Sequence, residues 1–185
     1  MTHRLALALA LPLLIAAGCA EDGPDAADPS AASTATADES QLEDIDYPDE
    51  GVDLVDRPEL EGAYQQALQT YVDFERGRRQ AAREGEVGRL LSLNGTASVV
   101  DPYREAFAAY SDGTYDGDVV IEFLEARPRD TVLRLDICVD ATRLVVPDGA
   151  PTQLGEATRA PQRIEVTNIL GPWRVTEVAS VDGSC

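Results

Sequence analysis

The residues that could carry chemistry in this chain are carboxylates, tyrosines and arginines. The single histidine, His3, lies in a segment that we interpret as a signal peptide, and the 15 remaining cationic residues are all arginines. Without an internal histidine or any lysine, the chain cannot form a Ser-His-Asp triad, a Cys-His pair, a histidine metal site or a Schiff base. Any catalysis must therefore use Asp or Glu together with Tyr or Arg.

A tyrosine-rich set of side chains is the candidate lining of a pocket. Glu177 belongs to this set because strict alternation from Trp173 and Val175 would direct it into the core. Alternatively, a bulge near residue 176 would turn Val178 inward and Glu177 outward. The tyrosines also fit an ordinary core with hydrogen-bonded hydroxyls, so no catalytic residue is assigned. The possible pocket residues are Tyr64, Tyr71, Tyr103, Phe107, Tyr110 and Glu177.

Four arginines, Arg76, Arg78, Arg79 and Arg83, cluster toward the end of the first expected helix. Cations are favourable near a helix C-terminus, so a solvated helix end accounts for them. The alternative is a site for an acidic partner or a phosphate.

The segment at residues 112–118 combines three aspartates with two glycines, a composition that could wrap calcium. It lacks the spacing of an EF-hand loop and the glutamate at the twelfth position. A turn accounts for the same residues, and we expect neither a metal site nor a cofactor.

The beginning of the chain has the layout of a secretory signal peptide. After His3 and Arg4, residues 5–17 form an uncharged run of 13, whereas about 20 residues are needed to span a bilayer. Small residues then precede Cys19, which resembles a bacterial lipobox, where signal peptidase II cuts before a cysteine that carries a diacylglycerol. We expect residues 1–18 to be removed and Cys19 to be lipidated. A secreted protein cut nearby and a retained anchor are the alternatives.

The other two cysteines, Cys138 and Cys185, then form an even pair in an oxidising extracytoplasmic space, where disulfides persist. Their bond would close a loop that the chain-entropy estimate values at roughly 4 kcal/mol. The alternatives are a buried free thiol with a frayed terminal one, or a metal site.

Charge and composition divide the rest of the chain into a tether and a domain. Thirteen of the 34 acidic residues fall between residues 21 and 57, against one arginine, and this stretch has little apolar periodicity. Residues 19–57 are therefore predicted to be a disordered acidic tether. Alternatively, its few apolar residues, which include Val52, Leu54 and Val55, pack back on the domain. The net charge of −19 argues against binding to nucleic acid.

Residues 58–185 are predicted to form one α+β domain. Apolar steps of three and four predict a helix from 58 to about 83, and shorter helices follow at 86–93 and 101–111. The third is expected to begin with Asp101 as N-cap and Pro102 in its first turn. After the helices, apolar residues recur at every second position, which predicts strands. The predicted strands lie near 118–126, 133–139, 160–169 and 173–181. Helices followed by strands in blocks indicate an α+β fold.

The strand segments carry motifs that resemble small secreted lipoproteins with an NTF2-like, cystatin-like fold from GC-rich Gram-positive-type bacteria. The resemblance covers residues 58–185 and departs at Pro172, which interrupts a Gly-Trp pair. It implies N-terminal helices packed on a curved antiparallel sheet, a cone that can hold a pocket. Ketosteroid isomerase, which belongs to the wider group, uses a pocket Asp with a Tyr. The matching residues are Cys138, Val139, Asp140, Asp148, Gly149, Arg159, Trp173, Arg174, Val175 and Cys185.

We therefore expect a lipoprotein anchored to the outer face of the cell membrane through acyl chains on Cys19. Its domain is expected to be a non-enzymatic accessory or binding module that recognises an envelope protein or an apolar small molecule. The alternative is a histidine-free pocket enzyme. An open cavity lined by tyrosine with an isolated, desolvated carboxylate would favour the enzyme, and a cone filled by side chains would favour a protein-interaction module.

Overall fold

A five-stranded sheet is the centre of the part of the chain that this computed structural model describes, residues 51–110 and 113–185. The strands lie in the order β1-β2-β3-β4-β5, and every neighbouring pair is antiparallel except β1 and β2, which are parallel. The predicted signal peptide and Cys19 lie outside the described residues. The strands are β1 (Val52–Val55), β2 (Val119–Arg129), β3 (Val132–Asp140), β4 (Arg159–Asn168) and β5 (Trp173–Ser180).

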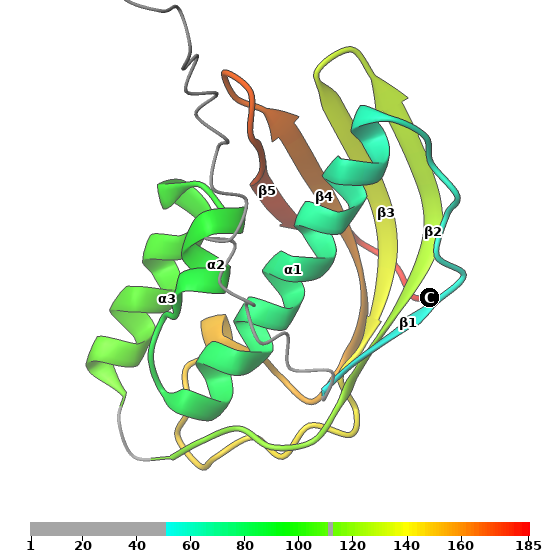
Figure 1. Ribbon diagram of the computed structural model, residues 1–185. Helices are drawn as coiled ribbons and strands as arrows, with labels where there is room; N and C mark the ends of the chain where they lie inside the picture. The colour runs from blue at the N-terminus through cyan, green and yellow to red at the C-terminus, as the bar shows by residue number, and fades with distance from the viewer. Residues whose placement is uncertain (1–50, 111–112) are drawn as a thin grey trace, which may run out of the picture. The chain divides into compact units, whose positions relative to one another are not determined.

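Three α-helices accompany this sheet in the described residues. The long helix α1 (Ala63–Glu84) crosses the face formed by β3, β4 and β5, and α2 (Arg89–Asn94) and α3 (Ala97–Ala109) lie beside it (Figure 1). A short 3-10 helix, η2 (Thr152–Leu154), lies in the connection between β3 and β4. The α+β class is as expected. None of the helices in these residues is long and apolar enough to cross a membrane.

Period-two alternation builds the sheet side of the core. On β3, Leu133, Leu135 and Ile137 are fully buried and face α1, while Arg134 is exposed. The helix side comes from α1, where residues three and four apart share a face. Tyr71 of α1 packs edge-on against Phe123 of β2, with ring centroids 6.0 Å apart.

The first strand corrects the expected order of elements. β1 lies before α1, so the helices are not clearly N-terminal, and its parallel pairing with β2 makes the sheet mixed instead of antiparallel. Hydrogen-bonded structure therefore begins ahead of residue 58. Val52 and Leu54 are half-buried while Asp53 and Val55 are exposed, which is the alternation of a strand with one side on the core.

The third helix begins earlier than predicted. Its N-cap is Thr96, whose backbone N–H donates to the carbonyl of Val175 on β5, so the helix starts where the chain leaves the sheet. The expectation of Asp101 as N-cap is wrong, and Pro102 lies inside the helix. Burial of Val100 in the early turn contributes roughly 1.5–3 kcal/mol, comparable with the cost of about 3 kcal/mol for an internal proline.

A disulfide joins β3 to the end of the chain, as the sequence predicted. Cys138 and Cys185 have an S–S distance of 2.07 Å and are 47 residues apart. Cys138 lies on the sheet face opposite the Leu133 and Leu135 row and is 1% exposed, since the disulfide covers it. The bond therefore holds the last residues against the outer face of the sheet.

Candidate ligand-binding cavity

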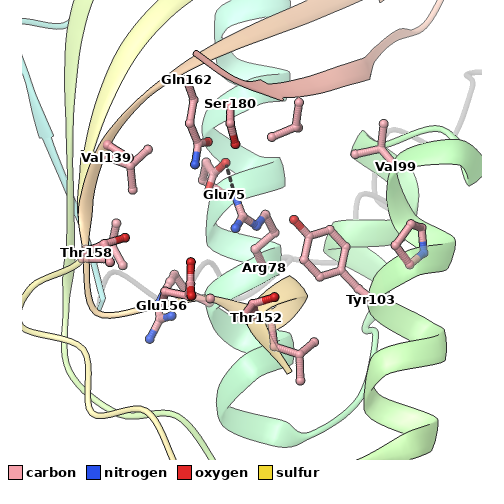
Figure 2. A pocket seen from close by; sticks show the side chains of 18 of the residues that line it. Glu75, Arg78, Val99, Tyr103, Val139, Thr152, Glu156, Thr158, Gln162 and Ser180 are labelled. Atoms are coloured by element: carbon pink, nitrogen blue, oxygen red, sulfur yellow. Dashed lines mark hydrogen bonds and ion pairs between the residues drawn. The ribbon is translucent and has the colours of Figure 1, made fainter. Parts of the chain in front are cut away.

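A cavity of about 630 Å³ lies among α1, α3, the strands β3 to β5 and the η2 segment. Figure 2 shows Arg78 between Glu75 and Tyr103 of α3, with Gln162 and Ser180 of the sheet above and Thr152 of η2 below. This volume is in the range of pockets that hold small molecules. The apolar part of the lining comprises Val99, Pro102, Val119, Val139, Ala141, Leu144, Leu154, Ala160 and Val178.

Three charged side chains of α1 line this cavity: Glu75, Arg78 and Arg79. Their spacing of three and four residues places them on the same side of the helix. Glu75 is 3% exposed and Arg79 is 5% exposed, although both are ionisable. Charged side chains are rarely buried to this extent unless they are paired, so the partners of each one determine what the cavity can bind.

Glu75 and Arg78 form an ion pair in which the carboxylate is buried and the arginine side chain is 18% exposed. One guanidinium nitrogen of Arg78 donates to both carboxylate oxygens of Glu75, at 2.9 and 3.1 Å. The guanidinium also lies over the Tyr103 ring, 5.2 Å from its centroid. Burial alone would lower the pKa of Arg78, but the charge of Glu75 raises it above the ordinary value. Burial raises the pKa of Tyr103, so this hydroxyl stays protonated at neutral pH.

Arg79, in contrast, forms no ion pair with any carboxylate in the described residues. Its side chain donates one hydrogen bond, from Nη2 to the carbonyl of Gly117 at 3.3 Å, and its Nε is buried without a partner. Burial, followed by the charges of Arg83 and Arg78, lowers the pKa of Arg79 to about 10. The guanidinium is still charged at neutral pH, and Glu75 and Asp118 offset this charge only from a distance. Within the described residues, the wall of the cavity therefore contains a cation without an ion pair.

A second polar atom of the cavity wall also lacks a partner. The Oε1 atom of Gln162 on β4 is buried and accepts no hydrogen bond within the described part of the chain. A buried acceptor left without a donor costs about 1–3 kcal/mol. Two residues of the cavity wall, Arg79 and Gln162, thus each have a buried polar atom without a hydrogen bond in the described part of the chain.

Two of the six predicted pocket residues, Tyr103 and Glu177, line the cavity. Tyr103 lies beside Arg78, whereas Glu177 is an exposed side chain on β5. A bulge explains the position of Glu177. In the pairing of β4 with β5, Glu165 is opposite Glu177 and Val166 is opposite Val175. Thr176 is therefore an extra residue of β5 with no residue opposite it on β4. The alternative of a bulge near residue 176 is therefore correct.

The other four predicted pocket residues lie outside the lining. Tyr64 donates from its hydroxyl to the carbonyl of Asp130 at 2.9 Å, and Tyr110 donates to that of Asp148 at 3.1 Å. Phe107 packs in a small apolar cluster beneath α3. Tyr71 is fully buried and its hydroxyl has no hydrogen-bond partner of good geometry. Burial, with the negative charge of Glu75, raises its pKa well above the ordinary value.

The main residues that the sequence analysis misjudged are Arg78 and Arg79. A solvated helix end does not describe them, because α3 and the sheet cover this face of α1. The spacing carried a usable signal: Glu75, Arg78 and Arg79 follow the apolar positions Leu68 and Tyr71 along the same face of the helix. A charged residue that continues the apolar stripe of a helix lies on the face that packs against the core, so it is a candidate for burial.

The described residues contain no group of three His, Cys, Asp or Glu side chains that could hold a metal ion. Of the acidic segment 112–118, Asp112 lies outside those residues. Asp116 accepts a hydrogen bond from the backbone N–H of Gly117, and its backbone pairs with Val145, an arrangement typical of a turn.

Comparison of the chain with protein-family models, with curated proteins and with solved structures finds no match in any of the three.

Proposed function

We propose that this protein is a lipid-anchored extracytoplasmic module that binds a small molecule in the cavity between α1, α3 and the sheet. The observation that carries the proposal is the cavity itself, which has a volume of about 630 Å³ and a lining that combines apolar side chains with the buried Glu75 and Arg79. A module that only contacted another protein would have no need for such a space. The mixture of apolar and charged walls suits a ligand with both kinds of surface.

Binding fits the geometry better than catalysis does. A general base needs a carboxylate that is free to accept a proton from the substrate. Glu75 is the deeply buried carboxylate of this wall, and Arg78 donates to both of its oxygens. The other two carboxylates of the lining, Glu156 and Glu177, are exposed. A histidine-free enzyme that uses a carboxylate and a tyrosine is therefore the weaker candidate.

For the fold family we propose an NTF2-like domain of the kind found in secreted lipoproteins. Its support is a long helix packed across one face of a curved sheet, a cavity between them, and a disulfide that joins β3 to the C-terminal residue. Two β-bulges add twist to the sheet. One lies between Phe123 and Glu125 of β2, and the other lies where Glu165 and Val166 of β4 pair with β5. The parallel strand β1 is an addition to this plan.

We also propose that Cys19 carries the membrane anchor and that the acidic tether holds the domain away from the anionic bilayer surface. Replacing Cys19 with Ala should release the protein into the culture medium and abolish incorporation of a labelled fatty acid. Cys185→Ala is the matched control, because it removes a cysteine of the disulfide and leaves the lipobox intact. Continued membrane association of the Cys19 variant would contradict the anchor.

The binding proposal is tested by native mass spectrometry of the full-length protein purified in detergent from its own cells. We expect a bound small molecule on the wild type. Ala160→Phe should remove it, because Ala160 lines the cavity and the larger side chain fills it. Ala179→Phe is the matched control, since Ala179 of β5 does not line the cavity. A wild-type protein without any bound molecule, or equal retention by both variants, would argue against the proposal.

A further inference from the structure

We infer that the cavity takes an anion, a carboxylate or phosphate group on a partly apolar body, and that Arg79 provides the charge that holds it. This inference rests on the proposed binding function and specifies the class of ligand. Arg79 lines the cavity, is 5% exposed and forms no ion pair with a carboxylate of the described residues. A charge buried in this way is costly unless an opposite charge is placed next to it.

The nearby carboxylates Glu75 and Asp118 act on Arg79 from a distance and form no ion pair with it. Glu75, the nearest buried carboxylate of the wall, is bound by Arg78 at 2.9 Å and has both oxygens occupied. Arg83 and Arg78 add positive charge near Arg79 and lower its pKa. Asp118 pairs with Arg83 at 3.8 Å and is half exposed. The lining also contains Glu156 and Glu177, but neither forms an ion pair with Arg79, so this guanidinium remains without a directly paired carboxylate among the described residues.

A guanidinium in a partly desolvated wall favours oxyanions, because its planar set of donors matches the geometry of carboxylates and phosphates. The apolar lining, which includes Val99, Val139 and Leu154, would cover a hydrocarbon part of the same ligand. An amphipathic anion satisfies both features together.

A structural role for Arg79 makes a different prediction from a binding role. If Arg79 mainly stabilised the fold through its contact with Gly117, replacing it would lower stability whether or not ligand is present. If it is kept for a ligand, the ligand-free protein should tolerate or gain from its loss, because an unneutralised buried charge disappears. Arg79→Met keeps a similar apolar length and removes the charge. Arg76→Met is the matched control, since Arg76 is on the same helix but does not line the cavity.

The experiment measures binding of octanoate, octyl phosphate, octanol and inorganic phosphate to the full-length protein by isothermal titration calorimetry. We expect one or both of the octyl anions to bind at least about tenfold more tightly than octanol, the gain of a charge-assisted hydrogen bond. The two octyl anions distinguish a carboxylate from a phosphate ligand. Inorganic phosphate should bind weakly, since it has no apolar body.

Arg79→Met should weaken the preferred anion at least about tenfold, leave octanol unchanged and keep or raise the unfolding midpoint of the ligand-free protein. Arg76→Met should retain anion binding. Octanol binding as tight as the anions would overturn the anion site but leave the proposed binding function intact. No binding of any octyl probe, together with no molecule on the native protein, would overturn both. The comparison of octanoate with octanol on the wild type needs no variant, so the inference remains testable if Arg79→Met does not fold.

Discussion

Replacement of Gly77 by alanine tests the close contact between α1 and α2. Gly77 lies in the interior of α1, where alanine is normally favoured over glycine by about 1 kcal/mol. A Cβ atom at this position would lie 2.5 Å from the backbone nitrogen of Leu91, 2.8 Å from its Cα and 3.0 Å from the carbonyl carbon of Leu90. All three atoms belong to the backbone of α2, so no side-chain rotation can relieve the overlap.

The steric effect should exceed the gain in helix propensity. Carbon atoms in good contact are about 3.5–4.0 Å apart, so α2 would have to move by roughly 1 Å. Leu90 and Leu91 are 4% and 0% exposed, and their displacement would disturb the core. Overpacking of this kind costs about 1–3 kcal/mol. After the gain in propensity, we expect a net loss of about 1–2 kcal/mol and a midpoint lower by roughly 4 °C per kcal/mol.

Urea and thermal unfolding followed by circular dichroism measure the effect. Gly88→Ala is the matched control, because Gly88 has φ −77° and a Cβ there would meet only the Gln80 side chain, at 3.9 Å. That variant should change stability by less than about 0.5 kcal/mol, since lower unfolded-state entropy offsets a poorer helix cap. If Gly77→Ala instead raised the free energy of unfolding by the propensity difference, the contact between α1 and α2 would be refuted.

Three further predictions concern stability. Reduction of the Cys138–Cys185 bond should lower the free energy of unfolding by up to about 4 kcal/mol, because the unfolded chain gains a free loop of 47 residues; an unchanged urea midpoint with both thiols alkylated would contradict this. Leu170 is fully exposed with φ 54°, so Leu170→Gly should raise the free energy of unfolding by about 0.5–1 kcal/mol, and any loss in the urea midpoint would count against it. Burial raises the pKa of Asp73, so its contribution to stability is present below the unfolded pKa and is lost as pH rises through the folded pKa. Asp73→Asn should therefore gain stability relative to the wild type between about pH 3 and pH 7, and urea midpoints that stay parallel across this range would oppose it.

The sequence predicted four of the five strands because their alternation is a local signal, and it predicted the disulfide from the two cysteines that remain after Cys19. Alternation along residues 133–139 fixes which side of β3 is buried, and it also places Cys138 on the other side. The sequence left the orientation of Glu177 undecided for a physical reason. Strict alternation directs this side chain into the core, whereas one extra residue near 176 directs it outward. Only the pairing of β5 with β4 decides between them.

The elements that the sequence did not predict depend on contacts between distant residues. β1 has four residues and pairs with β2, more than 60 positions away, so its hydrogen bonds leave no local pattern. The start of α3 is set by a hydrogen bond from Thr96 to Val175 of β5. Burial of Arg79 depends on α3 and the sheet closing over α1. In each case the deciding partner lies in another element of the fold.

The position of Arg79 lets an acidic domain bind an anion. Residues 58–185 carry 21 acidic residues against 13 arginines, and this excess repels anions at long range. That repulsion is screened beyond roughly 8 Å at physiological ionic strength. Arg78 and Arg79 both line the cavity, and no carboxylate of the described residues forms an ion pair with Arg79, so the partly desolvated wall strengthens its attraction to a bound anion. A small anion can enter such a site, whereas a polyanion would have to lie along the acidic surface. Cations placed inside an acidic shell therefore favour small anions over extended ones such as nucleic acids.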